Sequence, residues 1–388
     1  MFFEVDKTLG GLIGAKDGFP YCTKEDWEYI KDNYERKEVL VFIRDKVIEL
    51  DSPFPFAEVN CDLNSLFRSL KNDQLQVIRD PWVSLYSDTD PLYKGSYLQL
   101  SPNTYVYNRL SSKYTIKARH EGRYSNGLSP IDYWEQGKRK ENDFSRLTGL
   151  FMKPKLSRNS IIHAFSNERS IRTLTQFKPN CAKHLYDFFG AKRVLDFSAG
   201  WGDRLVGFLA SNAESYIGID PNTKLHNPYR QIHNAYAPDK EVRLLCSPSE
   251  DVDFTSLEYD FVFTSPPYFN LEIYSDEDTQ SSSRYQDFDL WLNEFLLKTF
   301  SLITESLKEN GRVAINISDF MWKGKKVVVS IPLLEHAKSL GLTYEGSIGY
   351  PLSPRQGVKE NVAEPIFVWS KGSNPPEPKW QQDYFFGV

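Results

Sequence analysis

The residues with the most distinctive chemistry form the run Thr264-Ser265-Pro266-Pro267-Tyr268-Phe269. This run follows an apolar stretch, residues 259–263, with the composition of a buried strand. Proline fixes its backbone φ and lacks an N–H group, so two prolines hold the local carbonyl groups rigid and free to accept hydrogen bonds. A hydroxyl, a fixed carbonyl and an aromatic ring side by side suit a flat ligand that carries an amino group. The structural alternative is a Pro-Pro turn closed by a core tyrosine.

A second candidate site follows an earlier apolar run, residues 193–197. Asp196 is followed by Gly200 and Gly202 where the pattern changes from strand to helix. Glycine adopts conformations that other residues avoid, and it lets the backbone approach a ligand closely. The next apolar run ends in Asp220, about 20 residues after the glycines, where a carboxylate can accept hydrogen bonds from ribose hydroxyls. The alternative is a tight strand-to-helix turn followed by an acidic strand end.

Two further groups of polar residues come later in the chain. Glu250 and Asp251 follow the third apolar run, a position suited to contacting an adenine ring, with a solvated helix start as the alternative. Arg284 and Tyr285 lie in the polar stretch after the two prolines. There they would line a base pocket, and the alternative is a mobile polar loop.

Strands and helices that would position these residues are expected from about Lys192 to the C-terminus, where short apolar runs alternate with longer amphipathic ones, with one helix before them. This alternation is typical of a parallel sheet covered by helices. The expected strands are 193–197, 216–220, 242–246, 259–263, 313–317, 343–348 and 365–369. The expected helices are 180–189, one from Asp203, 224–236, 288–307 and 328–340. Gly311 is expected to end the fourth of these as its C-cap.

The composition of the chain limits its class. With 388 residues, 40% of them hydrophobic, the chain can bury a large core. Its net charge of −5 argues against a protein that binds nucleic acid non-specifically over its whole surface. A local basic groove is compatible with this net charge. Four dispersed cysteines indicate neither disulfides nor a metal site, and the absence of a long apolar run predicts no membrane insertion and a cytoplasmic location.

Together these motifs resemble a known family. Residues 196–202 are similar to the cofactor-binding motif of class I S-adenosylmethionine-dependent methyltransferases. Ser265-Pro266-Pro267-Tyr268 is similar to the catalytic tetrapeptide of amino-methyltransferases that act on DNA and some RNAs. The resemblance covers about residues 160–388. It includes Phe177-Lys178-Pro179 before the first strand, and residues 364–369, which are similar to the final strand of the family's fold. It implies an α/β fold with a Rossmann-like seven-stranded sheet, and S-adenosylmethionine as cofactor.

The resemblance also assigns roles to residues of this chain. The implied catalytic residues are Ser265, Pro266, Pro267 and Tyr268. The implied cofactor-binding residues are Phe177, Asp196, Ser198, Gly200, Gly202, Asp220, Pro221, Glu250, Asp251 and Thr264. The implied substrate-binding residues are Phe269, Arg284 and Tyr285.

The expected reaction is methyl transfer to an exocyclic base amine, with DNA as the nucleic-acid partner. In the family resembled, a serine at the first tetrapeptide position is associated more often with the 4-amino group of cytosine, so cytosine is expected first and the 6-amino group of adenine second. An RNA base, a protein glutamine and a non-catalytic subunit of the same fold stay open as alternatives. A dinucleotide oxidoreductase is disfavoured, because the glycine run lacks the GxGxxG form.

The part before residue 159 has another organisation. It lacks the strand-helix alternation and begins with a helical stretch from Lys24 to Leu50, for which Thr23 is a suitable N-cap. We expect residues 1–158 to form an α+β accessory or target-recognition domain and residues 159–388 the methyltransferase domain. Basic and aromatic residues interleave between Tyr105 and Tyr124, which indicates either a nucleic-acid surface or a solvated β-hairpin.

Overall fold

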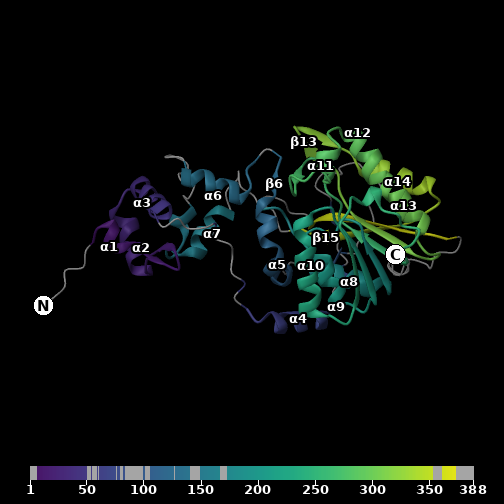
Figure 1. Ribbon diagram of the computed structural model, residues 1–388, viewed down its shortest axis with the longest axis horizontal. Helices are drawn as coiled ribbons and strands as arrows, with labels where there is room; N and C mark the ends of the chain where they lie inside the picture. Colours follow the sequence, from purple (N-terminus) through teal and green to yellow (C-terminus); the bar gives the residue numbers. More distant parts are fainter. Residues whose placement is uncertain are drawn as a thin grey trace, which may run out of the picture. The chain divides into compact units, whose positions relative to one another are not determined.

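The computed structural model describes most of the chain, in two compact units. The described residues are 7–49, 54, 59, 61–75, 77–78, 82–83, 99–100, 105–125, 127–139, 149–166, 173–352 and 361–372. One unit comprises residues 1–59 and 116–175, and the other comprises 60–115 and 176–388 (Figure 1). The boundary expected from the sequence near residue 158 stays a prediction.

The first unit is mainly helical and has its own apolar core. Its larger elements are α1 (Leu9–Leu12), the hairpin β1 (Gly14–Lys16) and β2 (Phe19–Tyr21), α2 (Lys24–Asn33), α3 (Arg36–Glu49), α6 (Pro130–Arg139) and α7 (Arg158–Ser166). Trp27, Ile43 and Trp134 are fully buried in its core. Thr23 caps α2 as predicted, accepting a hydrogen bond from the backbone N–H of Asp26. The single helix expected over 24–50 is instead two, because Tyr34 leaves the helical conformation.

The second unit contains the expected seven-stranded sheet. Its strands are β7 (Arg193–Asp196), β8 (Ser215–Ile219), β9 (Glu241–Leu245), β10 (Phe261–Thr264), β12 (Arg312–Asn316), β15 (Thr343–Pro351) and β16 (Asn361–Ser370). They lie in the order β15-β16-β12-β10-β7-β8-β9. The first five along the chain are parallel, and β16 runs antiparallel to β12 and β15. The short strands β3 (Val77–Ile78) and β5 (Gln99–Leu100) extend the sheet beyond β15, and β4 (Trp82–Val83) pairs with β16.

Helices cover both faces of this sheet. Helices α8 (Pro179–Phe189), α9 (Asp203–Ala210) and α10 (Thr223–Tyr236) lie together on one face, and α12 (Phe288–Leu290), α13 (Lys298–Ser306) and α14 (Ser330–Ser339) lie on the other (Figure 1). The helical run expected over 288–307 has a π-helical middle, η4 (Trp291–Leu297). The prediction of Gly311 as its C-cap is wrong, because the helix ends at Ser306 and Leu307 occupies the cap position. Gly311 instead lies where a β-carbon would come within 2.8 Å of the Lys308 carbonyl oxygen.

The region of interleaved basic and aromatic residues is helical. It forms the short helix η1 (Tyr105–Tyr107) and then α5 (Asn108–Glu121), so its interpretation as a β-hairpin is wrong. Alternation of basic and aromatic residues looks like a strand pattern, yet the buried positions Leu110, Ser111 and Thr115 are spaced for one face of a helix.

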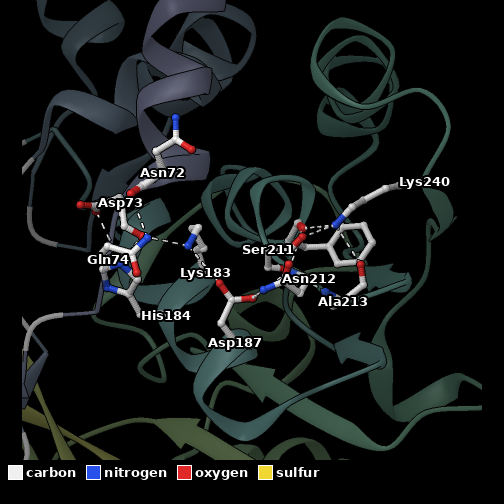
Figure 2. A network of polar contacts seen from close by, with 11 residues as sticks. Asn72, Asp73, Gln74, Lys183, His184, Asp187, Ser211, Asn212, Ala213 and Lys240 are labelled. Carbon is white, nitrogen blue, oxygen red and sulfur yellow. Dashed lines mark hydrogen bonds and ion pairs between the residues drawn. The ribbon is translucent and has the colours of Figure 1, made fainter.

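Helix α4 (Leu63–Asn72) is tied to this unit by a polar network that Figure 2 shows. The Lys183 amine donates to the Asp73 carbonyl at 2.9 Å and to the Asp187 carboxylate at 2.9 Å. The other oxygen of Asp187 accepts from the backbone N–H of Asn212 at 2.7 Å, just beyond the end of α9. Lys240 donates to three carbonyls around the same helix end, at 2.7–3.0 Å. The segment around Asp73 is therefore bonded into the helix layer that supports β7.

No helix in the described ranges is long and apolar enough to cross a bilayer. Those ranges also hold no group of three or more His, Cys, Asp or Glu side chains placed to bind a metal ion.

Candidate functional site

The sheet brings three of the predicted motifs to one edge. Strands β10, β7 and β8 are neighbours, and the segments that begin at Ser265, Phe197 and Asp220 follow their carboxyl ends. The chain turns to opposite sides of the sheet after β7 and after β10, which makes this the switch point where open α/β sheets bind ligands.

The glycine turn after β7 needs its glycines for conformational reasons. Gly200 and Gly202 have φ values of +59° and +80°, which side-chain-bearing residues rarely adopt. A β-carbon on Gly202 would also lie 3.0 Å from Ile232 of α10. The backbone N–H of Gly200 donates to the Asp220 carboxylate at 2.8 Å, so the turn and the end of β8 are joined directly.

Asp220 is a buried carboxylate with a high pKa. Burial raises its pKa to about 6, although hydrogen bonds from the N–H groups of Asn222 and Gly200 act in the opposite direction. The bond from Asn222 measures 2.9 Å. The backbone carbonyl oxygen of Asp220 lies 2.8 Å from a ring nitrogen of His226 in α10. This contact holds the turn that follows, which contains Pro221. A carboxylate whose pKa is close to neutrality is a frequent property of functional sites.

Asp196 is fully buried, and its carboxylate is bonded to side chains of three other elements. It accepts hydrogen bonds from Arg204 of α9, Tyr216 of β8 and Thr264 of β10, each at 2.8 Å. Arg204 also donates to the Ser198 carbonyl. Asp196 and Thr264 thus hold the strand ends together in this structure, and their direct contact with a cofactor stays a prediction.

Glu250 and Asp251, predicted to bind the cofactor, are bonded to Arg284 and Tyr285, predicted to bind the substrate. Arg284 makes a bidentate contact with Asp251, at 2.6 and 3.2 Å, and an ion pair with Glu250 at 2.9 Å. The Tyr285 hydroxyl donates to Glu250 at 2.9 Å. Burial raises the pKa of Glu250, while Tyr285 and Arg284 act to lower it.

These contacts belong to a longer connection, residues 271–287, which we call the bridging loop. Besides contacting the turn after β9, it contacts the turn after β8. The Thr223 backbone N–H donates to Glu277 at 3.1 Å, and the Thr279 hydroxyl donates to the Pro221 carbonyl at 3.4 Å. The bridging loop therefore links the tetrapeptide to both turns that the sequence assigns to the cofactor.

The tetrapeptide has one buried and three half-buried residues. Pro266 is buried, whereas Ser265, Pro267 and Tyr268 keep part of their surface. The Tyr268 hydroxyl accepts a 3.1 Å hydrogen bond from the backbone N–H of Ser318, which follows β12, and burial raises the pKa of this hydroxyl. The Tyr268 ring is thus held in a fixed orientation at the strand end.

Phe269 and Phe177 are more deeply enclosed than their predicted roles suggest. Phe269 has a φ of +45° and is 4% exposed, with its ring among Phe288, Trp291 and Trp322. Phe177 is 8% exposed and stacks on Tyr350 at 4.6 Å between ring centroids. The roles of both in binding substrate or cofactor stay predictions. A backbone outlier in a non-glycine residue next to the tetrapeptide is consistent with a functional constraint there.

Sequence reasoning missed the residues that hold the site in place. Arg204 and Tyr216 complete the Asp196 cluster, and Ser318 positions Tyr268. The place of Ser318, just beyond the end of a predicted strand, was the available signal, since parallel strands end at the same edge. Arg204 and Tyr216 gave no such signal, because each lies inside a regular element.

Comparison with known proteins finds no matching family model and no matching curated protein. Among solved structures, TehB from Haemophilus influenzae aligns over 54% of this chain and 66% of its own, with 10% identity and a TM-score of 0.34. TrmN from Thermus thermophilus aligns over 50% and 48%, with 18% identity and a TM-score of 0.35. An S-adenosylmethionine-dependent methyltransferase from Clostridium acetobutylicum ATCC 824 aligns over 55% and 99%, with 12% identity and a TM-score of 0.37. The chain spans two thirds or less of the length of the first two proteins.

The strand order itself defines the class of fold. A doubly wound seven-stranded sheet with six parallel strands, and with the last strand, β16, antiparallel between β12 and β15, is the Rossmann-like fold of class I methyltransferases. The fold class expected from the sequence is confirmed.

Proposed function

We propose that this protein is an S-adenosylmethionine-dependent methyltransferase that methylates an exocyclic amine of a DNA base, first of all the 4-amino group of cytosine. One observation carries the proposal. The Ser265-Pro266-Pro267-Tyr268 run follows β10 at the switch point, beside the glycine turn after β7 and the acidic end of β8. A fold alone does not define a function, whereas this combination of groups does suggest one.

The residues around the glycine turn fit the cofactor. Gly200 leaves room at the turn, since a β-carbon there would have no neighbour closer than 3.7 Å. Asp220 supplies a carboxylate for ribose hydroxyls. Among the described residues, the buried amide nitrogens of Asn222 and Gln280 have no hydrogen-bond partner. Asn222 follows Pro221 in the chain, and Gln280 follows Thr279, whose hydroxyl donates to the Pro221 carbonyl. Buried donors without partners favour a polar ligand at this place. When bound, S-adenosylmethionine supplies an electrophilic methyl group.

The tetrapeptide supplies what an amine acceptor needs. The lone pair of an exocyclic amine is delocalised into the ring, so the amine is a weak nucleophile. Hydrogen bonds from its two N–H groups to the Ser265 hydroxyl and the Pro266 carbonyl would favour a pyramidal nitrogen and stabilise its developing positive charge. Tyr268, fixed by Ser318, would stack on the base. A base from duplex DNA must first leave the helix, at a cost of a few kcal/mol that an aromatic pocket partly offsets.

The choice of base rests on Ser265. A neutral hydroxyl accepts a hydrogen bond more weakly than the carboxylate of an aspartate would. The more electron-rich cytosine amine needs less help, so cytosine is the first choice and the 6-amino group of adenine the second. An RNA base or a protein glutamine, which also present planar amino groups, are the remaining substrates of the same pocket.

Nucleoside analysis tests the proposal. The protein is incubated with S-adenosylmethionine and random-sequence DNA or RNA, and the nucleic acid is then digested and analysed by mass spectrometry. We expect 4-methylcytosine in DNA. Finding only 6-methyladenine would refute the choice of base, and a modified base only in RNA would refute DNA. No modified base in either would direct the search to protein substrates.

The variant Tyr268→Ala serves as the control. Because the ring is assigned to the base, the variant should lose at least about 100-fold in methylation, the scale of a positioning contribution to the transition state. Cofactor affinity measured by calorimetry should change less than about threefold, that is, by well under 1 kcal/mol. Wild-type turnover in this variant would contradict the pocket described above.

A further inference from the structure

A small β-hairpin extends directly from the segment that positions Tyr268. It consists of β13 (Phe320–Trp322) and β14 (Lys325–Val327), paired antiparallel, and follows Ser318 by one residue. Its two-residue turn, Lys323 and Gly324, has positive φ at both positions, +47° and +78°. Two positive φ values are the mark of a type I′ turn, which matches the twist of the strands and makes a stiff hairpin.

One face of this hairpin packs on the two aromatic residues after the prolines. Phe320 meets Tyr268, and Trp322 meets Phe269, each at 5.6 Å between ring centroids and with the rings nearly perpendicular. Edge-to-face contacts of this kind stabilise the packing beyond the buried area alone. The hairpin is therefore held at two points, by Tyr268 of the tetrapeptide and by Phe269, which follows it.

The tip of the hairpin is strongly basic. Lys323, Lys325 and Lys326 are all exposed within four residues, next to the exposed Met321. Within the described ranges none of the three lysines forms an ion pair, and Lys323 lies over the Trp322 ring at 5.3 Å. In a chain with net charge −5, three unpaired cations on one short hairpin are a local excess of positive charge.

We propose that the β13–β14 hairpin is the DNA-backbone grip of this protein, with Lys323, Lys325 and Lys326 binding phosphates next to the target base. This inference rests on the proposed function. Lys323 directly follows Trp322, which contacts Phe269, and it lies three residues beyond Phe320, so at about 3.3 Å per residue the turn lies on the order of 10 Å from the Phe320–Tyr268 contact. Phosphates of one DNA strand recur about every 3.4 Å along the helix axis, so the lysines lie within reach of phosphates a few nucleotides from a base at Tyr268.

The test replaces the three lysines together, as Lys323→Gln, Lys325→Gln and Lys326→Gln. Methylation kinetics and DNA binding are measured for the full chain between about 50 and 200 mM salt, the range over which phosphate contacts change affinity most visibly. We expect the KM for DNA to rise by about tenfold or more, and the slope of log Kd against log salt to fall by about two to three, since each phosphate contact contributes nearly one. The kcat at saturating DNA and the affinity for S-adenosylmethionine should stay as in the wild type.

Two matched variants make the result specific. Lys→Arg at the same three positions keeps the charge and should restore the wild-type KM and salt slope. Lys192, Lys308 and Lys338 lie at the amino-end side of the sheet, so replacing these three by Gln changes net charge equally and should leave the KM for DNA unchanged.

The outcomes separate the two proposals. A wild-type protein that never methylates DNA refutes the proposed function, whatever the variants do. A wild-type protein that methylates DNA, with an unchanged KM and salt slope in the Gln variant, overturns the role of the hairpin alone. An equal loss in the Arg variant or in the distant Lys192, Lys308 and Lys338 variant also overturns it.

Discussion

Asp220 combines a structural and a proposed binding role in one carboxylate. It accepts hydrogen bonds from Gly200 and Asn222, and burial raises its pKa to about 6. A raised folded-state pKa means that this group contributes stability below the unfolded pKa of 3.8, a contribution that is lost as the pH rises through about 6. The fold therefore tolerates the proton, whereas a ribose hydroxyl needs the ionised carboxylate as acceptor.

We predict that the affinity for S-adenosylmethionine falls as the pH drops below about 6, because Asp220 then gains a proton. In Asp220→Asn this pH dependence should disappear, and affinity at pH 7 should be lower by about 10- to 100-fold, the scale of one charge-assisted hydrogen bond. Calorimetric titration at several pH values measures both effects. An identical pH profile in the wild type and the variant would assign the titration to another group.

The bridging loop is the element that joins the proposed cofactor and base sites. Arg284 and Tyr285 contact Glu250 and Asp251, while Glu277 contacts the turn after β8. A ligand enclosed by these turns would have to pass a loop held by an ion-pair cluster. Because the same loop follows the tetrapeptide in the chain, its position would also affect the base contact proposed for Tyr268.

We predict that Arg284→Ala accelerates dissociation of S-adenosylmethionine by about 2- to 5-fold, since a partly exposed ion pair is worth up to roughly 1 kcal/mol. Stopped-flow release of bound cofactor measures the rate. Arg284→Lys keeps the charge but loses the bidentate contact with Asp251, so its rate should fall between those of the wild type and the alanine variant. Equal rates in all three proteins would mean that the loop does not control release.

At the scale of the whole molecule, residues 60–115 belong to the unit that carries the sheet. Asn108 and Ser111 donate to the buried carboxylate of Asp203, the first residue of α9, at 2.9 and 2.5 Å. Asp73 contacts Lys183 and His184 of α8, as Figure 2 shows. The helix layer behind the glycine turn is thus completed by residues from the first third of the chain.

We predict that a fragment of residues 159–388 folds poorly, because it removes Asn108 and Ser111, whose hydrogen bonds to Asp203 are shorter than the 3.3 Å contact from Gln176 that the fragment keeps. A hydrogen bond to a charged group contributes about 1.5–3 kcal/mol, so the loss of two such bonds removes a large part of the stability of a domain. A fragment of residues 60–388 should keep these contacts and unfold at a clearly higher temperature. Thermal unfolding by circular dichroism compares the two. Equal stability would support the domain boundary expected from the sequence at residue 158.

The sequence by itself determined the features that depend on a few neighbouring residues. Strand β7 and the glycine turn after it, the acidic end of β8 and the position of the tetrapeptide after β10 all follow from apolar runs and turn chemistry. Each of these features is read from a segment of about ten residues. Strands joined by helices run parallel, so their carboxyl ends meet at the same edge of the sheet.

Only the tertiary structure decided which side chains meet across the fold. The partners of Asp196 lie 8, 20 and 68 residues away along the chain, and Ser111 lies 92 residues from Asp203. The bond between Arg284 and Asp251, and the packing of the lysine-bearing hairpin against Tyr268 and Phe269, also join distant segments. Such pairs depend on how helices and strands pack in three dimensions, and this packing cannot be read from local residue patterns.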